Sequence, residues 1–141
     1  MSPARLVVAK STFGVPVLTI VKLVATELPQ LGVAVTDGDG AVLYRFGKDE
    51  ARAWRSHHAG VRAQDWLPVL TRRKPVLDGI FPDIVGTVSR VDGSRHVMLN
   101  GWPLYRYLGD TEPGQWRGQG VAGIWFVAQP DGEKNLTCLR K

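Results

Sequence analysis

The sequence predicts a mostly β protein of the α+β class: a compact antiparallel β domain with a short helical insert around residues 50–66. Three observations support this. Short runs of valine, isoleucine, leucine and threonine recur along the chain, with Asp-Gly turns between several of them. Sixteen glycines and nine prolines favour many turns and short elements. The length of 141 residues suits one domain, residues 1–141, which can fold without disulfides.

The first part of the chain predicts strands and a hairpin. Residues 5–24 are β-like, and "LGVAVTD" at 31–37 predicts a further strand. The turn "GDG" then leads into "AVLYRF" at 41–46, and this spacing of Asp and Gly between apolar runs is typical of a hairpin. Residues 48–70 differ because Ala, Arg, Glu and Gln dominate them, so they predict one or two short helices that end before Pro68.

The second part returns to β-structure. Residues 71–83 predict a loop because Pro75 and Pro82 interrupt them. Strands are then expected in the apolar segments that follow, at residues 84–91, 95–100, 103–107 and 121–129.

One sequence pattern occurs twice in the chain. "VTDGDGAVLYRFGKDE" and "SRVDGSRHVMLNGWPLYRYLGDTE" both contain an Asp-Gly turn and a strand that ends in Leu-Tyr-Arg-aromatic. Both continue to an aspartate, which gives the pattern Tyr-x-aromatic-x-x-Asp. Its residues are Tyr44, Phe46 and Asp49 in the first copy and Tyr105, Tyr107 and Asp110 in the second. The repetition predicts an internal duplication, with pseudo-repeated hairpin units at residues 31–70 and 84–130 packed about a pseudo-twofold axis.

The repeated aromatic residues have two interpretations. Residues i and i+2 of a strand share a face, so period-two aromatics favour core packing, with the two aspartates capping turns. Alternatively, the aromatics line a ligand pocket together with the glycine-rich loop "GQWRGQG", whose arginine can bind an anion. The residues of this candidate pocket are Tyr44, Phe46, Tyr105, Tyr107, Trp116, Arg117 and Trp125.

The motif resembles that of the bacterial secreted-repeat lipoproteins of unknown function, which a Tyr-x-aromatic-x-x-Asp pattern defines. The resemblance covers residues 31 to 133, and "NGWPLYRYLGDTEPGQWRGQGVAGIWFV" at 100–127 is its most specific part. In the first copy, "WLPVL" at 66–70 stands for the family's Trp-Pro-Pro-Leu. The resemblance implies a fold and a motif, but little mechanism, because the family has no settled chemistry.

Two departures from the family bear on location. Members usually carry two cysteines four residues apart, at the places that His58 and Arg62 occupy in this chain. Members are also usually exported, often with a lipid-bearing N-terminal cysteine. The N-terminal segment lacks the basic start, apolar region and small-residue cleavage site that follow one another in a secretory signal. Charged residues and proline also interrupt it too often for it to span a bilayer. Cys138 is the one cysteine, so we expect a cytoplasmic protein with no intrachain disulfide.

The charge does not indicate a nucleic-acid-binding protein. The formal net charge is +5 and the pI about 9.7, but the basic residues are scattered. The densest runs are "TRRK" at 71–74 and "CLRK" at 138–141, and no nucleic-acid-binding motif accompanies them.

Histidines and aspartates supply the candidates for chemistry. His57 and His58 are adjacent, and on a helix they point about 100° apart, so one metal ion cannot easily bind both. A transition metal or haem iron would need a further ligand, such as His96 or one of the motif aspartates. No metal-binding spacing supports such a site, and exposed helix histidines are the simpler interpretation. The aspartates Asp49 and Asp110 form an acid–base pair if the duplication brings them together.

The sequence thus predicts a small soluble binding or accessory protein, with an aromatic-lined pocket for a small ligand or a redox cofactor. One alternative is a metal- or haem-assisted enzyme that uses His57, His58 or His96 with Asp49 or Asp110, and His58, Asp49 and Asp110 are its catalytic candidates. Another alternative is a protein–protein adaptor that works through its basic surface and the tail "NLTCLRK". The sequence leaves open whether the chain is catalytic.

Overall fold

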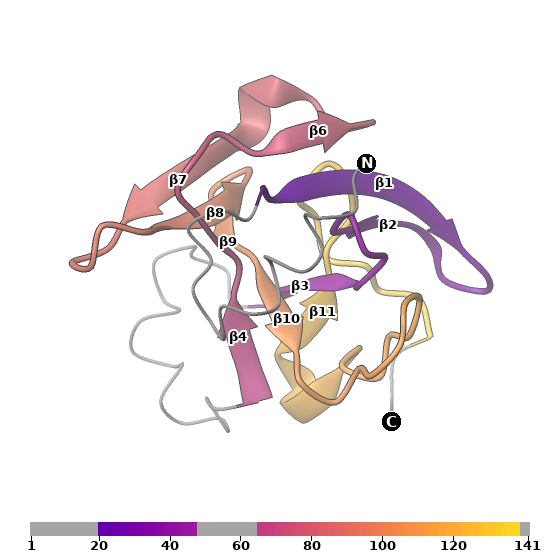
Figure 1. The fold of residues 1–141 in the computed structure, drawn as a ribbon. Coiled ribbons are helices and arrows are strands. Elements are labelled where there is room, and N and C mark those ends of the chain that lie inside the picture. The colour runs from indigo at the N-terminus through magenta and orange to yellow at the C-terminus, as the bar shows by residue number, and fades with distance from the viewer. Residues whose placement is uncertain (1–19, 48–64, 139–141) are drawn as a thin grey trace.

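The computed structural model describes residues 20–47 and 65–138, which form three β-sheets with almost no helix (Figure 1). The predicted mostly β class is therefore confirmed. Nearly all paired strands are antiparallel, as expected, but β1 and β6 are parallel. The two repeated hairpin units stay a prediction, and the helical insert lies almost entirely outside the described residues.

The strands are distributed over three small sheets. From one edge to the other, the first sheet contains β2 (Gly32–Thr36), β1 (Lys22–Leu28) and β6 (Val76–Asp78). The second contains β11 (Trp125–Val127), β3 (Leu43–Phe46), β10 (Tyr105–Tyr107) and β4 (Trp66–Pro68). The third contains β5 (Leu70–Thr71), β8 (Arg95–Leu99) and β7 (Val85–Ser89), with β9 (Trp102–Pro103) paired to β8. The short 3-10 helices η5 (Pro82–Ile84) and η6 (Val121–Gly123) lie in the connections.

Three segments differ from the expected secondary structure. Strand β4 begins at Trp66, where the end of a helix was expected, and β5 includes Thr71, where a loop was expected, because β4 pairs with β10 and β5 with β8. Residues 76–78 form β6 instead of a loop, because they pair with β1. The last strand begins at Trp125 and not at residue 121, because Ala122 and Gly123 have left-handed φ angles of 56° and 73°.

The central feature of the second sheet is the pairing of the two motif strands. β3 and β10 are adjacent and antiparallel, with Tyr44 directly opposite Tyr105. On the outer sides, β11 places Trp125 opposite Phe46, and β4 places Trp66 opposite Tyr107. Segments far apart in the sequence thus lie side by side in the middle of one sheet (Figure 1).

Among the described residues, the core contains one aliphatic and one largely aromatic cluster. The aromatic cluster is built around two stacked indoles, Trp66 and Trp125, whose ring centroids are 3.9 Å apart and whose planes differ by 5°. Tyr44 meets Trp66 edge-on at 5.3 Å, and Tyr105 meets Trp125 edge-on at 5.0 Å. Such aromatic pairs add about 0.5–1.5 kcal/mol each beyond the area that they bury. The motif aromatics therefore hold the centre of the fold together.

The described residues contain no helix of the length and apolar character needed to cross a bilayer.

Candidate functional site

Tyr44 and Asp110 join the two copies of the motif. The Tyr44 hydroxyl donates to Asp110 Oδ2 at 2.5 Å and accepts from the backbone N–H of Gly118 at 3.1 Å. The other oxygen of the carboxylate, Asp110 Oδ1, accepts from the backbone N–H of Arg117 at 2.8 Å. The tyrosine of the first copy and the aspartate of the second thus fix both ends of the loop at residues 110–118.

A tight turn after β10 brings Asp110 to this position. The backbone N–H of Asp110 donates to the carbonyl oxygen of Tyr107 at 3.0 Å. A Cβ atom on the intervening Gly109 would lie 2.5 Å from the Tyr107 ring, which is closer than real contacts allow. Glycine is therefore needed at this turn.

The far end of the loop lies directly on the aromatic core. Gly118 is buried, and a Cβ atom there would lie 2.8 Å from the Trp66 ring and 2.9 Å from the Tyr44 ring. The absence of a side chain lets the backbone approach the rings closely enough for the Gly118 N–H to reach the Tyr44 hydroxyl.

Two glutamines, Gln115 within the loop and Gln119 directly after it, form hydrogen bonds that hold the backbone in place. Gln115 Oε1 accepts from the backbone N–H groups of Thr111 and Glu112, at 2.6 and 3.0 Å. Gln119 is buried, and its Nε2 donates to the carbonyl oxygens of Asn135 and Thr137, both at 2.8 Å. Its Oε1 accepts from the Val127 N–H at 2.8 Å. The sequence interpretation missed both glutamines, because no local pattern distinguishes a structural glutamine from a solvated one.

The protonation of the Tyr44–Asp110 pair follows from its surroundings. Burial raises the pKa of the Asp110 carboxyl, and the hydrogen bonds from Tyr44 and Arg117 offset this only in part. Burial, followed by the hydrogen bond to Asp110, raises the pKa of the Tyr44 hydroxyl far above its ordinary value. Tyr44 therefore keeps its proton at neutral pH and is the donor of the pair.

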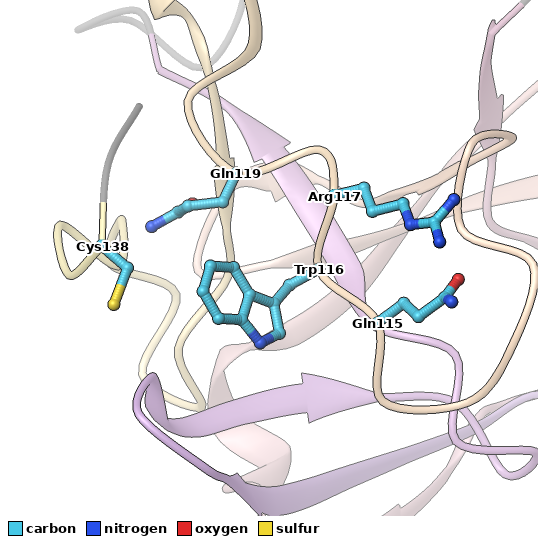
Figure 2. A pocket seen from close by; sticks show the side chains of 5 residues that line it. All are labelled: Gln115, Trp116, Arg117, Gln119 and Cys138. Atoms are coloured by element: carbon cyan, nitrogen blue, oxygen red, sulfur yellow. The ribbon is translucent and has the colours of Figure 1, made fainter. Parts of the chain in front are cut away.

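The organised loop borders an open pocket of about 300 Å³. Its lining residues are Gln115, Trp116, Arg117, Gln119 and Cys138. Figure 2 shows the Trp116 indole in the middle, with Gln119 and Cys138 on one side and Arg117 and Gln115 on the other. Trp116 is half-buried and Arg117 is exposed, so an aromatic face and a cationic group are presented together.

The two arginines of the motif strands have structural partners that the sequence did not reveal. Arg45 is buried, donates to the carbonyl oxygens of Phe46 and Gly132, and places its guanidinium 3.5 Å from the centre of the Trp102 ring. Burial lowers the pKa of Arg45 to about 10. Arg106 pairs with Asp37 at 3.0 Å. These arginines support the strands and do not line the pocket.

The predicted pocket residues divide into two groups. Tyr44, Phe46, Tyr105 and Trp125 are buried in the aromatic cluster, and Tyr107 is half-buried against it. Only Trp116 and Arg117 of the predicted set line the pocket.

The candidates for chemistry are only partly described. His96 is buried, with its Nε2 2.8 Å from the Leu104 carbonyl oxygen and its ring edge-on to Tyr105. Asp49, His57 and His58 lie outside the described residues. Within residues 20–47 and 65–138, no three His, Cys, Asp or Glu side chains are grouped so that they could hold a metal ion.

The comparisons with known proteins found one similarity, and it covers the loop. Residues 86–129 match the model of a family described as "Secreted repeat of unknown function". This segment runs from β7 to β11 and includes the whole loop at residues 110–118, and the matched family is the one that the motif resembles. Neither the search of curated proteins nor that of solved structures gave a match. The family description speaks of secretion, and the expected cytoplasmic location stays a prediction.

Proposed function

We propose that this protein binds a small planar anion in the pocket beside the loop at residues 110–118. One observation carries the proposal: the hydrogen bonds of Tyr44 and Asp110 fix the loop, and two side chains of that loop, Trp116 and Arg117, line the pocket. A ligand that enters a fixed site loses less binding free energy to ordering of the protein.

The lining side chains suggest the chemistry of the ligand. The indole of Trp116 offers a flat apolar surface on which a planar ring can stack. The guanidinium of Arg117 can donate charge-assisted hydrogen bonds to a carboxylate, and the Gln115 amide can add a neutral donor. An aromatic carboxylate has both features. In this proposal the buried motif aromatics support the loop and do not touch the ligand.

We also infer that the chain consists of two related halves. The order β11-β3-β10-β4 reads equivalently from either end when Tyr44 is exchanged with Tyr105 and Trp125 with Trp66. Backbone hydrogen bonds follow the same exchange: Ala128 N–H to the Leu43 carbonyl matches Val69 N–H to the Leu104 carbonyl, at 3.0 Å in both. These equivalences support the predicted duplication about a pseudo-twofold axis between Tyr44 and Tyr105.

A titration with 2-naphthoate, a planar aromatic carboxylate, tests the proposed site. We expect two-dimensional ¹H–¹⁵N NMR spectra to shift at the Trp116 indole N–H and at the amides of residues 115–119. Trp116→Leu and Arg117→Gln should each weaken binding by about tenfold or more. Tyr44→Phe should also weaken it, because the loop loses an anchor although no lining residue changes. Shifts that leave residues 115–119 unaffected would overturn the proposal.

The two alternatives stay predictions. The metal- or haem-assisted enzyme uses His57, His58 or His96 with Asp49 or Asp110, and His57, His58 and Asp49 lie outside the described residues. For the adaptor, the tail is anchored to the fold. Asn135 is buried and donates through Nδ2 to the Leu31 carbonyl at 3.1 Å, and the Thr137 carbonyl accepts from Gln119 at 2.8 Å. Removal of residues 134–141 would therefore disturb the fold as well as any partner site, and point changes at the exposed Leu136 are the better test.

A further inference from the structure

We propose a second ligand site, for a phosphate monoester with an apolar body, in a cavity between strands β6 and β7. The cavity has a volume of about 560 Å³, larger than the loop pocket. β6 and β7 lie near each other at one end of the molecule, with β8 beside β7 (Figure 1). The loop pocket is lined by other residues, so the two proposals are independent.

Three cationic side chains line the cavity. Arg73 and Lys74 come from the connection between β5 and β6, and Arg95 begins β8. All three are exposed, and none forms an ion pair with a carboxylate within the described part of the chain. Among the described residues, no acidic side chain lines the cavity. Two residues of the basic run at 71–74, Arg73 and Lys74, thus contribute to a concave site.

The remaining wall is largely apolar. Pro75, Leu77, Pro82 and Val85 line it, and Leu77 and Val85 pack against the aliphatic core cluster. The interior side of the cavity is therefore apolar, and the exposed side is cationic. A ligand that satisfies both carries its charge at one end and an apolar body at the other.

The number of cations favours a phosphate monoester. Two guanidinium groups and one ammonium group can donate to several oxygens at once, and a phosphate monoester offers three such oxygens with close to two negative charges at neutral pH. The attraction gains strength because the cavity wall excludes part of the solvent.

The backbone of β7 adds a way to observe binding at this site. β7 is an edge strand of its sheet, and its residues Gly86 and Thr87 line the cavity. A Cβ atom at Gly86 would meet no atom within 4 Å, so the space beside it is open. The amides of Gly86 and Thr87 are therefore reporters that lie far along the chain from the loop pocket.

The test is an NMR titration with phenyl phosphate, repeated with inorganic phosphate. We expect phenyl phosphate to shift the amides of Leu77, Gly86 and Thr87, and to bind at least about tenfold more tightly than inorganic phosphate, since only the ester uses the apolar wall. Arg73→Gln and Arg95→Gln should each weaken binding by about tenfold. Arg72→Gln is the matched control, because it removes the same charge from a residue next to Arg73 that does not line the cavity.

Three results would overturn this inference. Shifts at residues 115–119 and not at Gly86 and Thr87 would assign the phenyl phosphate to the loop pocket. Equal losses with Arg72→Gln and Arg73→Gln would show general attraction to a basic surface. Equal affinity for phenyl phosphate and inorganic phosphate would show that the apolar wall contributes nothing. None of these results depends on whether 2-naphthoate binds beside Trp116.

Discussion

At the scale of single residues, aspartates organise the turns of this protein by accepting backbone N–H groups. Asp37 Oδ1 accepts from Asp39 and Ala41, at 2.9 and 3.0 Å, and Asp92 Oδ1 accepts from the Ser94 N–H at 2.9 Å. Asp110 does the same for Arg117, but it is half-buried, whereas Asp92 is exposed. Asp92 and Asp110 therefore have the same structural role, but their pKa values shift in opposite directions.

The contributions of Asp92 and Asp110 to the stability of the fold should depend on pH in opposite ways. Hydrogen bonds from the Ser94 side chain and backbone lower the pKa of Asp92 below its usual 3.8. Its contribution is thus present at neutral pH and is lost as the pH falls through the folded-state value. Burial raises the pKa of Asp110, so its charged form disfavours folding at neutral pH, and this is relieved as the pH falls toward the unfolded value.

Urea unfolding of Asp92→Asn and Asp110→Asn, from pH 7 down to about pH 3, measures both effects. As the pH falls, the wild type should lose stability relative to Asp92→Asn and gain stability relative to Asp110→Asn. If both differences moved in the same direction, the assigned environment of Asp110 would be wrong.

At the scale of elements, the loop at residues 110–118 depends on close backbone packing against the aromatic cluster. Gly118→Ala should destabilise the protein by about 1–3 kcal/mol, because the new methyl group overlaps the Trp66 and Tyr44 rings. Gly86→Ala is the control, since a Cβ atom there meets nothing within 4 Å and its φ is not left-handed; its effect should stay within about 0.5 kcal/mol. Equal stability of the two variants in urea would contradict the described packing.

The sequence predicted elements well where the signal is local and poorly where it is not. Asp-Gly turns between apolar runs located β2, β3, β7 and β8 to within a few residues. The strands β4 and β6 were missed, because Pro68 and Pro75 suggest breaks and their partners, β10 and β1, are distant in the sequence. Long-range pairing overrides local preference at such positions.

The candidate site shows the same division. One interpretation of the sequence put Trp116 and Arg117 beside a pocket, on a glycine-rich loop whose arginine can bind an anion, and both line the loop pocket. The sequence could not predict the hydrogen bond from Tyr44 to Asp110, because the register of β3 and β10 determines which residues of the two motif copies meet. The β6–β7 cavity was invisible for a related reason: Arg73 and Arg95 come from different strands and connections.

At the scale of the whole molecule, the central sheet makes segments far apart in the sequence depend on each other. Its inner strands carry the two motifs, and the stacked Trp66 and Trp125 come from the outer strands β4 and β11. The C-terminal segment adds a further link, since the Asn135 side chain donates to the Leu31 carbonyl. Neither motif strand can therefore complete its side of the core without the other.

The most direct test of this mutual dependence is a double-mutant cycle between Tyr44 and Asp110, measured as free energy of unfolding in urea. Tyr44→Phe and Asp110→Ala should each cost about 1–3 kcal/mol, because each leaves a buried or half-buried polar group without its partner. The double variant should be less destabilised than the sum of the two, with a coupling energy of at least about 1 kcal/mol. Losses that add to within about 0.5 kcal/mol would show that the two motifs are not coupled through this pair and would contradict the account.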